Sequence, residues 1–182
     1  MKRFLIAACA ALLPGLSALA ADAPRPGIVL SSSSFTDGGI IPDKHTANSP
    51  APVSPALSWI NTPPGTQSFA LIFHDPDTAL QRKTDDVLHW LMFNIPGSVT
   101  SLPEGVENTA QLPDGSIQGK NFYDKPGFLG PASPLVYHHY MFELFALDTK
   151  LALGPDATRA DVINAMNGHI LGKGVVAGRF HR

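Results

Sequence analysis

The sequence predicts a mainly β protein whose sheets stack as a β-sandwich. The 182 residues include 16 glycines and 17 prolines, which divide the chain into the short segments typical of strands and turns. Three of these segments are apolar and rich in aromatic residues. Because they are apolar on both faces, we expect them to be central strands covered on each side, as in layered sheets.

The three predicted central strands span residues 68–74 (SFALIFH), 87–95 (VLHWLMFNI) and 138–147 (HHYMFELFAL). Turn residues bound each of them. Segments 42–66 and 96–136 are rich in proline and glycine and lack a clear period. We predict them to be long loops, which in compact domains often carry function.

One helix is predicted within residues 155–171 (PDATRADVINAMNGHIL), where apolar residues recur near helical spacing. Thr158 is followed three residues later by Asp161, which is typical of a capping box. Gly168 is expected to interrupt the helix.

Residues 1–20 have the layout of a cleavable secretory signal, with a basic pair, an apolar stretch and Ala-Leu-Ala before the expected cleavage after Ala20. Pro14 interrupts the apolar stretch, which disfavours a transmembrane anchor. We therefore predict a signal peptide at 1–20, one domain at 21–182, and a periplasmic or secreted location.

Charge and cysteine content exclude several classes of protein. The formal net charge of −2 becomes −4 without the signal's two cations, so nothing basic enough for nucleic acid remains. The single cysteine lies in the signal, which excludes disulfides and thiolate sites in the domain. The sequence also lacks G-x-S-x-G, H-E-x-x-H, P-loop and Rossmann motifs.

Two polar groups adjoin the first two predicted strands. Pro76 stiffens the turn that carries Asp75 and Asp77, so both carboxylates are rigid hydrogen-bond acceptors or simply parts of an ordinary turn. His89 opens a buried-looking strand. It is either a core residue satisfied by a neighbour, or a site residue whose ring N–H is held by Asp75 or Asp77.

The third strand contributes two more candidates. Alternation along residues 138–147 places His138 and Tyr140 on one face and His139 on the other. His138 and Tyr140 then have the geometry to donate two hydrogen bonds to one ligand oxygen. Aromatic packing with polar tips at the rim is the structural alternative.

The same residues also allow two enzymatic interpretations, and neither is complete. A hydrolase would use His89 or His138 as base, Asp75 to orient it and Tyr140 as a donor, yet no nucleophile is evident. A zinc site would add His74, which alternation directs away from Asp75 if the strand continues. We therefore predict a non-enzyme with no metal and no cofactor.

Several motifs occur together in one order along the chain. They are Ser54-Pro55-Ala56-Leu57-Ser58-Trp59, Asp75-Pro76-Asp77, His89-Trp90, Asn94-Ile95-Pro96, Gly119-Lys120-Asn121, Gly130-Pro131 and His138-His139-Tyr140. Taken jointly, they resemble the phosphatidylethanolamine-binding protein family, specifically its bacterial Raf-kinase-inhibitor-like branch, from about Phe35 to the C-terminus. That resemblance implies antiparallel sheets with a few peripheral helices, including a closing helix and strand.

The resemblance also implies a small pocket for phosphate-like anions or phospholipid headgroups. Asp77 and Trp90 are expected to support the pocket from behind. Asp75 would oppose a bare phosphate, so it should either bind the ammonium of a phosphoethanolamine group or orient a histidine. The residues that match the family's ligand-binding positions are Asp75, His89, Gly130, Pro131, His138 and Tyr140.

Two stretches depart from the family's pattern. Thr78-Ala79-Leu80 follows the Asp75 motif where a small residue and proline are usual, and Ala132-Ser133-Pro134-Leu135-Val136 replaces a Pro-Pro pair and a glycine. Both stretches are expected at the rim of the pocket, where ligand size and access depend on them. The sequence thus predicts an exported, non-catalytic binding protein. A protein-interaction or inhibitor module is the alternative, and a homodimer remains open.

Overall fold

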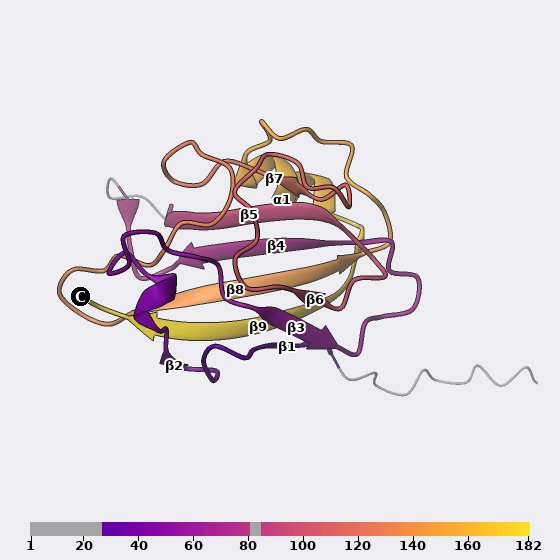
Figure 1. Cartoon of the computed structure of the whole chain (residues 1–182). Coiled ribbons are helices and arrows are strands. Elements are labelled where there is room, and N and C mark those ends of the chain that lie inside the picture. Colours follow the sequence, from indigo (N-terminus) through magenta and orange to yellow (C-terminus); the bar gives the residue numbers. More distant parts are fainter. Residues whose placement is uncertain (1–26, 81–84) are drawn as a thin grey trace, which may run out of the picture.

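The computed structural model describes residues 27–80 and 85–182, which form two stacked β-sheets (Figure 1). The larger sheet has the strand order β2-β9-β8-β4-β5-β7, and the smaller has the order β1-β3-β6. Strand pairs are antiparallel except for β2 and β9, which run parallel. The predicted fold class is confirmed, whereas the predicted signal at 1–20 lies outside the described residues.

The bounds of the elements follow chain order. They are β1 Val29–Ser32, β2 Gly39–Ile40, the 3₁₀ helix η1 Asp43–His45, β3 Leu57–Ile60, β4 Ser68–Asp75, β5 Val87–Pro96, β6 Ser101–Leu102, β7 Ile117–Gln118, β8 His138–Leu147, α1 Arg159–Met166 and β9 Ile170–Phe180.

The three predicted central strands are confirmed as β4, β5 and β8, and both faces of their sheet are covered. On one face, side chains such as Leu71 pack with Trp59 of the smaller sheet. On the other, Ile72 packs with Val162 and Met166 of α1. Burial on both sides explains the nearly continuous apolar runs.

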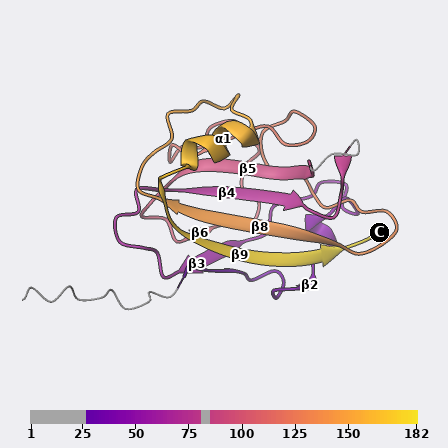
Figure 2. The same cartoon turned by 180° about the vertical axis from the view of Figure 1, so that it is seen from behind.

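The capping box predicted for the helix is also present. The Thr158 side chain accepts the N–H of Asp161, and the Asp161 side chain accepts the N–H of Thr158. After the helix, Gly168 takes a positive φ of 83°, and β9 begins two residues later. Figure 2 shows α1 lying over the β5 side of the six-stranded sheet.

The segments predicted to be loops contain three short strands as well. The first holds β3, and the second holds β6 and β7. Part of the second segment is fastened to the edge of β5, because Phe122 N–H donates to Leu88 O and Leu129 N–H donates to His89 O, each at 2.8 Å. This attachment forms one wall of the site described below.

The strands converge at one end of the sandwich. Strands β4 and β9 end there, and β5 and β8 begin there, close to η1 and the C-terminus (Figure 1). Residues from distant parts of the chain therefore meet at this end.

Candidate functional site

A cavity of about 290 Å³ opens at the end of the sandwich where β4 ends and β8 begins. Its lining includes Asp75, His89, Gly130, His138 and Tyr140, which are five of the six residues predicted to bind a ligand. A second depression, of about 370 Å³, is lined by apolar residues, glycines and uncharged polar residues and contains no titratable side chain. The first cavity is therefore the candidate functional site.

Strand alternation places three of these side chains together. Asp75 ends β4 two residues after the core residue Phe73, and His138 and Tyr140 precede the core residue Phe142 on β8. Side chains two residues apart on a strand point to the same side. Asp75, His138 and Tyr140 therefore lie on the same face of the large sheet as the core. They occupy the end of that face, beyond the part that the smaller sheet covers.

His89 reaches the same cavity through a β-bulge. In the pairing of β4 with β5, Phe73 lies opposite Trp90 and His74 lies opposite Leu88, so His89 has no partner. A bulge changes the direction of a side chain relative to simple alternation. The His89 ring accordingly contacts Phe73, with ring centres 5.3 Å apart, and Tyr140, at 5.2 Å.

Asp75 is buried and fully engaged by neighbouring protein groups. Its Oδ2 accepts hydrogen bonds from His138 Nδ1 at 2.7 Å and from Thr78 Oγ1 at 3.0 Å. Its Oδ1 accepts the N–H of Asp77 at 3.0 Å. Of the two roles predicted for Asp75, the orientation of a histidine is therefore the one that these contacts favour.

The bond to Asp75 determines which nitrogen of His138 carries a proton. A carboxylate only accepts, so Nδ1 is the donor in that bond. The Nε2 atom is left for the cavity, which His138 lines. A charge-assisted bond of this kind also holds the ring in one orientation.

His89 is held by a backbone carbonyl, so the expectation that Asp75 or Asp77 would hold it is wrong. Its Nδ1 donates to Leu129 O at 2.9 Å. Burial lowers the pKa of His89 below its ordinary value of 6.5. At neutral pH the ring is therefore neutral, and Nε2 is an acceptor on the cavity side.

Tyr140 anchors the loop that closes the cavity. Its hydroxyl oxygen accepts the N–H groups of Ala132, at 3.2 Å, and Ser133, at 3.0 Å. These two backbone donors of the loop after Gly130 are thus used within the protein. Burial raises the pKa of Tyr140 to about 12, so its hydroxyl keeps its proton and remains a donor.

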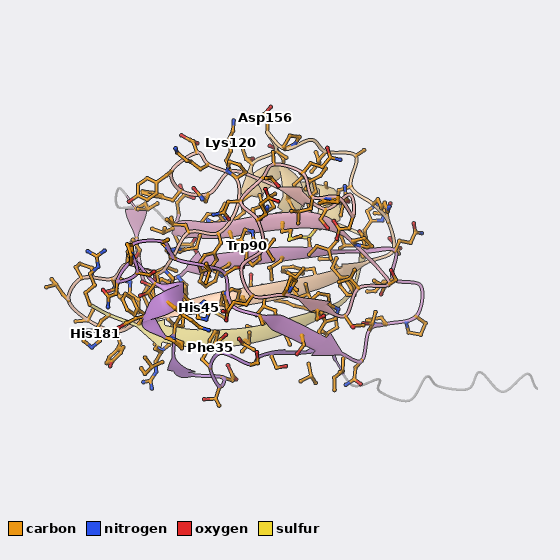
Figure 3. The ribbon with its side chains drawn as sticks, viewed as in Figure 1. Phe35, His45, Trp90, Lys120, Asp156 and His181 are labelled. Carbon is orange, nitrogen blue, oxygen red and sulfur yellow. The ribbon has the colours of Figure 1, made fainter. Side chains whose placement is uncertain are left out.

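The remaining predicted residues lie outside the cavity lining. Pro131 accepts the N–H of Ala47 through its carbonyl oxygen. The Asp77 carboxylate accepts the N–H and Nδ1–H of His139 on the outer surface. Trp90 is buried in the sandwich, where its Nε1 donates to Gln118 Oε1 at 2.6 Å (Figure 3).

His74 does not join the other candidate metal ligands. It points to the opposite side of the sheet from Asp75, where Nδ1 lies 2.6 Å from Asp86 Oδ2 and Nε2 lies 3.7 Å from Glu143 Oε2. Within residues 27–80 and 85–182, no three His, Cys, Asp or Glu side chains are placed to hold a metal ion together.

Several lining residues were not singled out as site residues from the sequence, among them Thr78, Arg182 and Tyr123. Thr78 belongs to the stretch that departs from the family pattern, and its hydroxyl supports Asp75. Arg182 lines the cavity from the C-terminus, and its main-chain N–H donates to Ser133 O. Tyr123 contributes from the segment beside β5. Of these residues, only Thr78 could have been recognised from the local sequence, because it lies three residues after Asp75.

Comparisons with known proteins identify the family to which this fold belongs. The family model described as phosphatidylethanolamine-binding protein matches residues 31–181. A UPF0098 protein of Methanothermobacter thermautotrophicus is 42% identical over 153 residues, covering 84% of this chain and 98% of its own. A UPF0098 protein of Chlamydia pneumoniae is 36% identical, with coverages of 84% and 98%.

Solved structures agree with the sequence relatives. A phosphatidylethanolamine-binding protein homologue from Chlamydia trachomatis superimposes with a TM-score of 0.77 at 28% identity, covering 86% of this chain and 98% of its own. E. coli YbcL, described as a member of the mammalian family, gives 0.75 at 28% identity, with coverages of 86% and 99%. The chain belongs to the phosphatidylethanolamine-binding protein family, as its motifs predicted.

In the described part of the chain, no helix combines the length and the apolar character that crossing a bilayer requires.

Proposed function

We propose that this chain is a binding protein that holds a phosphate-like anion, or the phosphate of a lipid headgroup, in the cavity beside His138. The Asp75–His138 pair is the observation that carries the proposal. Asp75 holds the imidazole by Nδ1, which leaves Nε2 facing the cavity as a donor once the ring is protonated. The Tyr140 hydroxyl also lines the cavity, and Arg182 adds a positive charge to its wall.

The engagement of Asp75 also determines which anions the cavity should prefer. The three donors His138, Thr78 and Asp77 N–H already use its two oxygen atoms. Little of the carboxylate is left for an ammonium group. We therefore expect a phosphate monoester without an ammonium to bind at least as well as phosphoethanolamine.

The hydrogen bonds of the serine and threonine hydroxyl groups at the cavity favour ligand binding over catalysis. Thr78 Oγ1 donates to Asp75, and Ser133 Oγ donates to the carbonyl oxygen of Val136. A serine or threonine nucleophile would instead have to give its proton to a base. Ser133 donates to a carbonyl oxygen and not to a base, and Thr78 donates to a carboxylate that His138 and the Asp77 N–H already engage.

Calorimetric titration tests the proposal directly. Inorganic phosphate is expected to release or absorb heat with one site per chain, and phosphoethanolamine is expected to bind no more tightly. Markedly tighter binding of phosphoethanolamine would show that Asp75 does contact the ammonium. The absence of heat from both ligands, confirmed by an unchanged melting temperature at high ligand concentration, would reject the anion site.

The same titration, run with sulfate across pH, reports on His89. Burial lowers the pKa of His89 in the free protein, and a nearby anion favours the protonated ring and therefore raises it. Binding should then take up protons, and affinity should increase as pH falls from neutrality toward the lowered pKa of His89. Sulfate is used because it does not titrate in this range. A decrease in sulfate affinity on acidification would show that the bound anion does not favour the protonated His89 ring.

We also propose that the protein acts outside the cytoplasm, on the basis of the signal-like residues 1–20. Expression of the full chain in a bacterium should yield a periplasmic or secreted protein whose N-terminus is Ala21. Cell fractionation followed by intact mass measurement checks this result. Full-length protein confined to the cytoplasm would reject the proposed export.

A further inference from the structure

A third depression, of about 380 Å³, adjoins the cavity and shares two lining residues with it, Tyr123 and Leu129. The Tyr123 side chain is 64% exposed, so much of its ring is open to a ligand. Because the two hollows share a wall, a molecule that fills the cavity and extends past Tyr123 enters this second space, the Tyr123 depression. The rest of its lining consists of Asn108, Asn121, Lys125, Pro126 and Phe128.

The turn that carries Tyr123 and Lys125 is closed around the side chain of Asn121. Asn121 Oδ1 accepts the N–H of Tyr123 at 3.0 Å and the N–H of Lys125 at 3.4 Å. Its Nδ2 donates to Gly127 O at 3.2 Å, and its main-chain N–H donates to Lys125 O at 2.8 Å. Asn121 is buried, so the turn presents both side chains from a fixed backbone. A site that is arranged in advance loses less entropy when a ligand binds.

The Tyr123 ring is supported without being covered. Phe122 contacts it edge-on, with ring centres 5.2 Å apart. The main chain of Phe122 is fastened to β5 through Leu88 O, and its side chain lines the cavity. Tyrosine offers a large and rigid contact surface whose side chain loses little entropy on binding. Tyr123 therefore presents an aromatic surface for the part of a ligand that leaves the cavity.

The free polar side-chain groups of the Tyr123 depression are mainly hydrogen-bond donors. Asn108 Oδ1 accepts the N–H of Phe128 at 2.9 Å, which leaves the Nδ2 amide group for a ligand. Lys125 adds an ammonium group. No described residue of this lining is an Asp or Glu, and Asn121 Oδ1 already accepts main-chain N–H groups. The depression therefore suits a chemical group that is rich in acceptor oxygen atoms.

We propose that the ligand of this protein is a phosphorylated sugar, whose phosphate occupies the cavity and whose ring lies on Tyr123. A sugar ring has apolar C–H groups on its faces and oxygen atoms around its edge. Its C–H face packs on the Tyr123 ring, and its edge oxygens accept hydrogen bonds from Asn108 Nδ2 and Lys125 Nζ. This subsite rests on the proposed anion site, for which it names the class of ligand.

Other organic groups match the Tyr123 depression less well. An acyl chain would take water from the Asn108 amide and the Lys125 ammonium without offering them a partner. The amino group of a nucleobase needs an acceptor, and the amide oxygens of Asn108 and Asn121 are already engaged. A sugar uses the aromatic surface and the donors together, which is how ligand pockets usually combine apolar walls with a few polar groups.

Calorimetric titration of the mature protein with sugar phosphates tests the subsite. Ethyl phosphate is a phosphate monoester without a ring, so it reports on the cavity alone. At least one of the 6-phosphates of glucose, galactose, mannose and N-acetylglucosamine is expected to bind about tenfold more tightly than ethyl phosphate. The same sugars without phosphate should bind far more weakly, because they lack the group that the cavity holds.

Three variants locate this preference, measured as the ratio of sugar phosphate affinity to ethyl phosphate affinity. Tyr123→Ala should reduce the ratio to about one, because the stacking surface is lost. Lys125→Ala should lower the ratio and leave ethyl phosphate binding unchanged, because Lys125 does not line the cavity. Tyr137→Ala is the matched control. Tyr137 is also an exposed tyrosine but lines neither hollow, so the wild-type ratio should remain.

The results separate the sugar subsite from the anion site. A wild type that binds ethyl phosphate but prefers none of the sugar phosphates would overturn the subsite and leave the anion site standing. An unchanged ratio in Tyr123→Ala would also overturn it, as would a sugar that binds equally well with and without its phosphate. Failure of every phosphate compound to bind would reject the anion site and the subsite together.

Discussion

Replacing His138 with alanine should weaken phosphate binding by about ten- to hundredfold, which is the expected effect of losing a hydrogen bond to a charged group. The fold should tolerate the change. Asp75 retains the hydrogen bonds from Thr78 Oγ1 and the Asp77 N–H, so its carboxylate is not left without donors. Titration calorimetry measures the affinity, and thermal unfolding measures the stability.

His139→Ala is the control for this experiment. His139 is the next residue on β8, but its ring lies on the outer surface against Asp77. This variant should bind phosphate as wild type does. Equal losses of affinity in both variants would show that the cavity is not the binding site, and unfolding of His138→Ala would assign His138 to the structural core.

Phe73→Ala should lower the free energy of unfolding by about 3–5 kcal/mol, the usual range for removing a buried phenylalanine side chain. Phe73 lies directly beneath the site. Its ring stacks on Phe142, with centres 3.8 Å apart, and on Phe128 at 5.6 Å. It also contacts the rings of His89 and Tyr140. Phosphate affinity should therefore fall together with stability.

Phe145→Ala is the control that shows what the removal of an aromatic ring away from the site does to stability and phosphate affinity. Phe145 lies on the other face of β8, where Lys173 Nζ is 5.0 Å from the ring centre and the side chain is only half-buried. Urea denaturation should show a clearly smaller loss, and phosphate binding should be unchanged. A Phe73→Ala protein with wild-type affinity would contradict the supporting role of Phe73.

Local sequence was sufficient for the elements whose signals are local. The central strands β4, β5 and β8 are long apolar runs bounded by turns, and burial on both faces by the smaller sheet and α1 is the reason. The capping box at Thr158 involves residues three apart and was equally visible. The short strands β3, β6 and β7 were missed because each contains too few residues to establish a period.

Strand β9 had no clear strand signal of its own, because glycines interrupt it. Its glycines are explained only by packing. A Cβ atom on Gly178 would lie 2.4 Å from Ile41 Cγ1, and one on Gly174 would lie 2.9 Å from the main-chain oxygen of Ile28. Glycine permits these close approaches. The resemblance implied a closing strand, whereas the residues alone did not.

The sequence by itself determined that Asp75 is held rigidly beside Pro76, and that His138 and Tyr140 share a face, because both features depend on neighbours one or two residues away. Tertiary structure decided what these groups contact. The bulge that turns His89 toward Tyr140, the Leu129 carbonyl that holds it, and the Arg182 side chain at the wall each require segments far apart in the chain to meet. Such contacts arise from strand pairing and burial across the whole domain, and no local spacing encodes them.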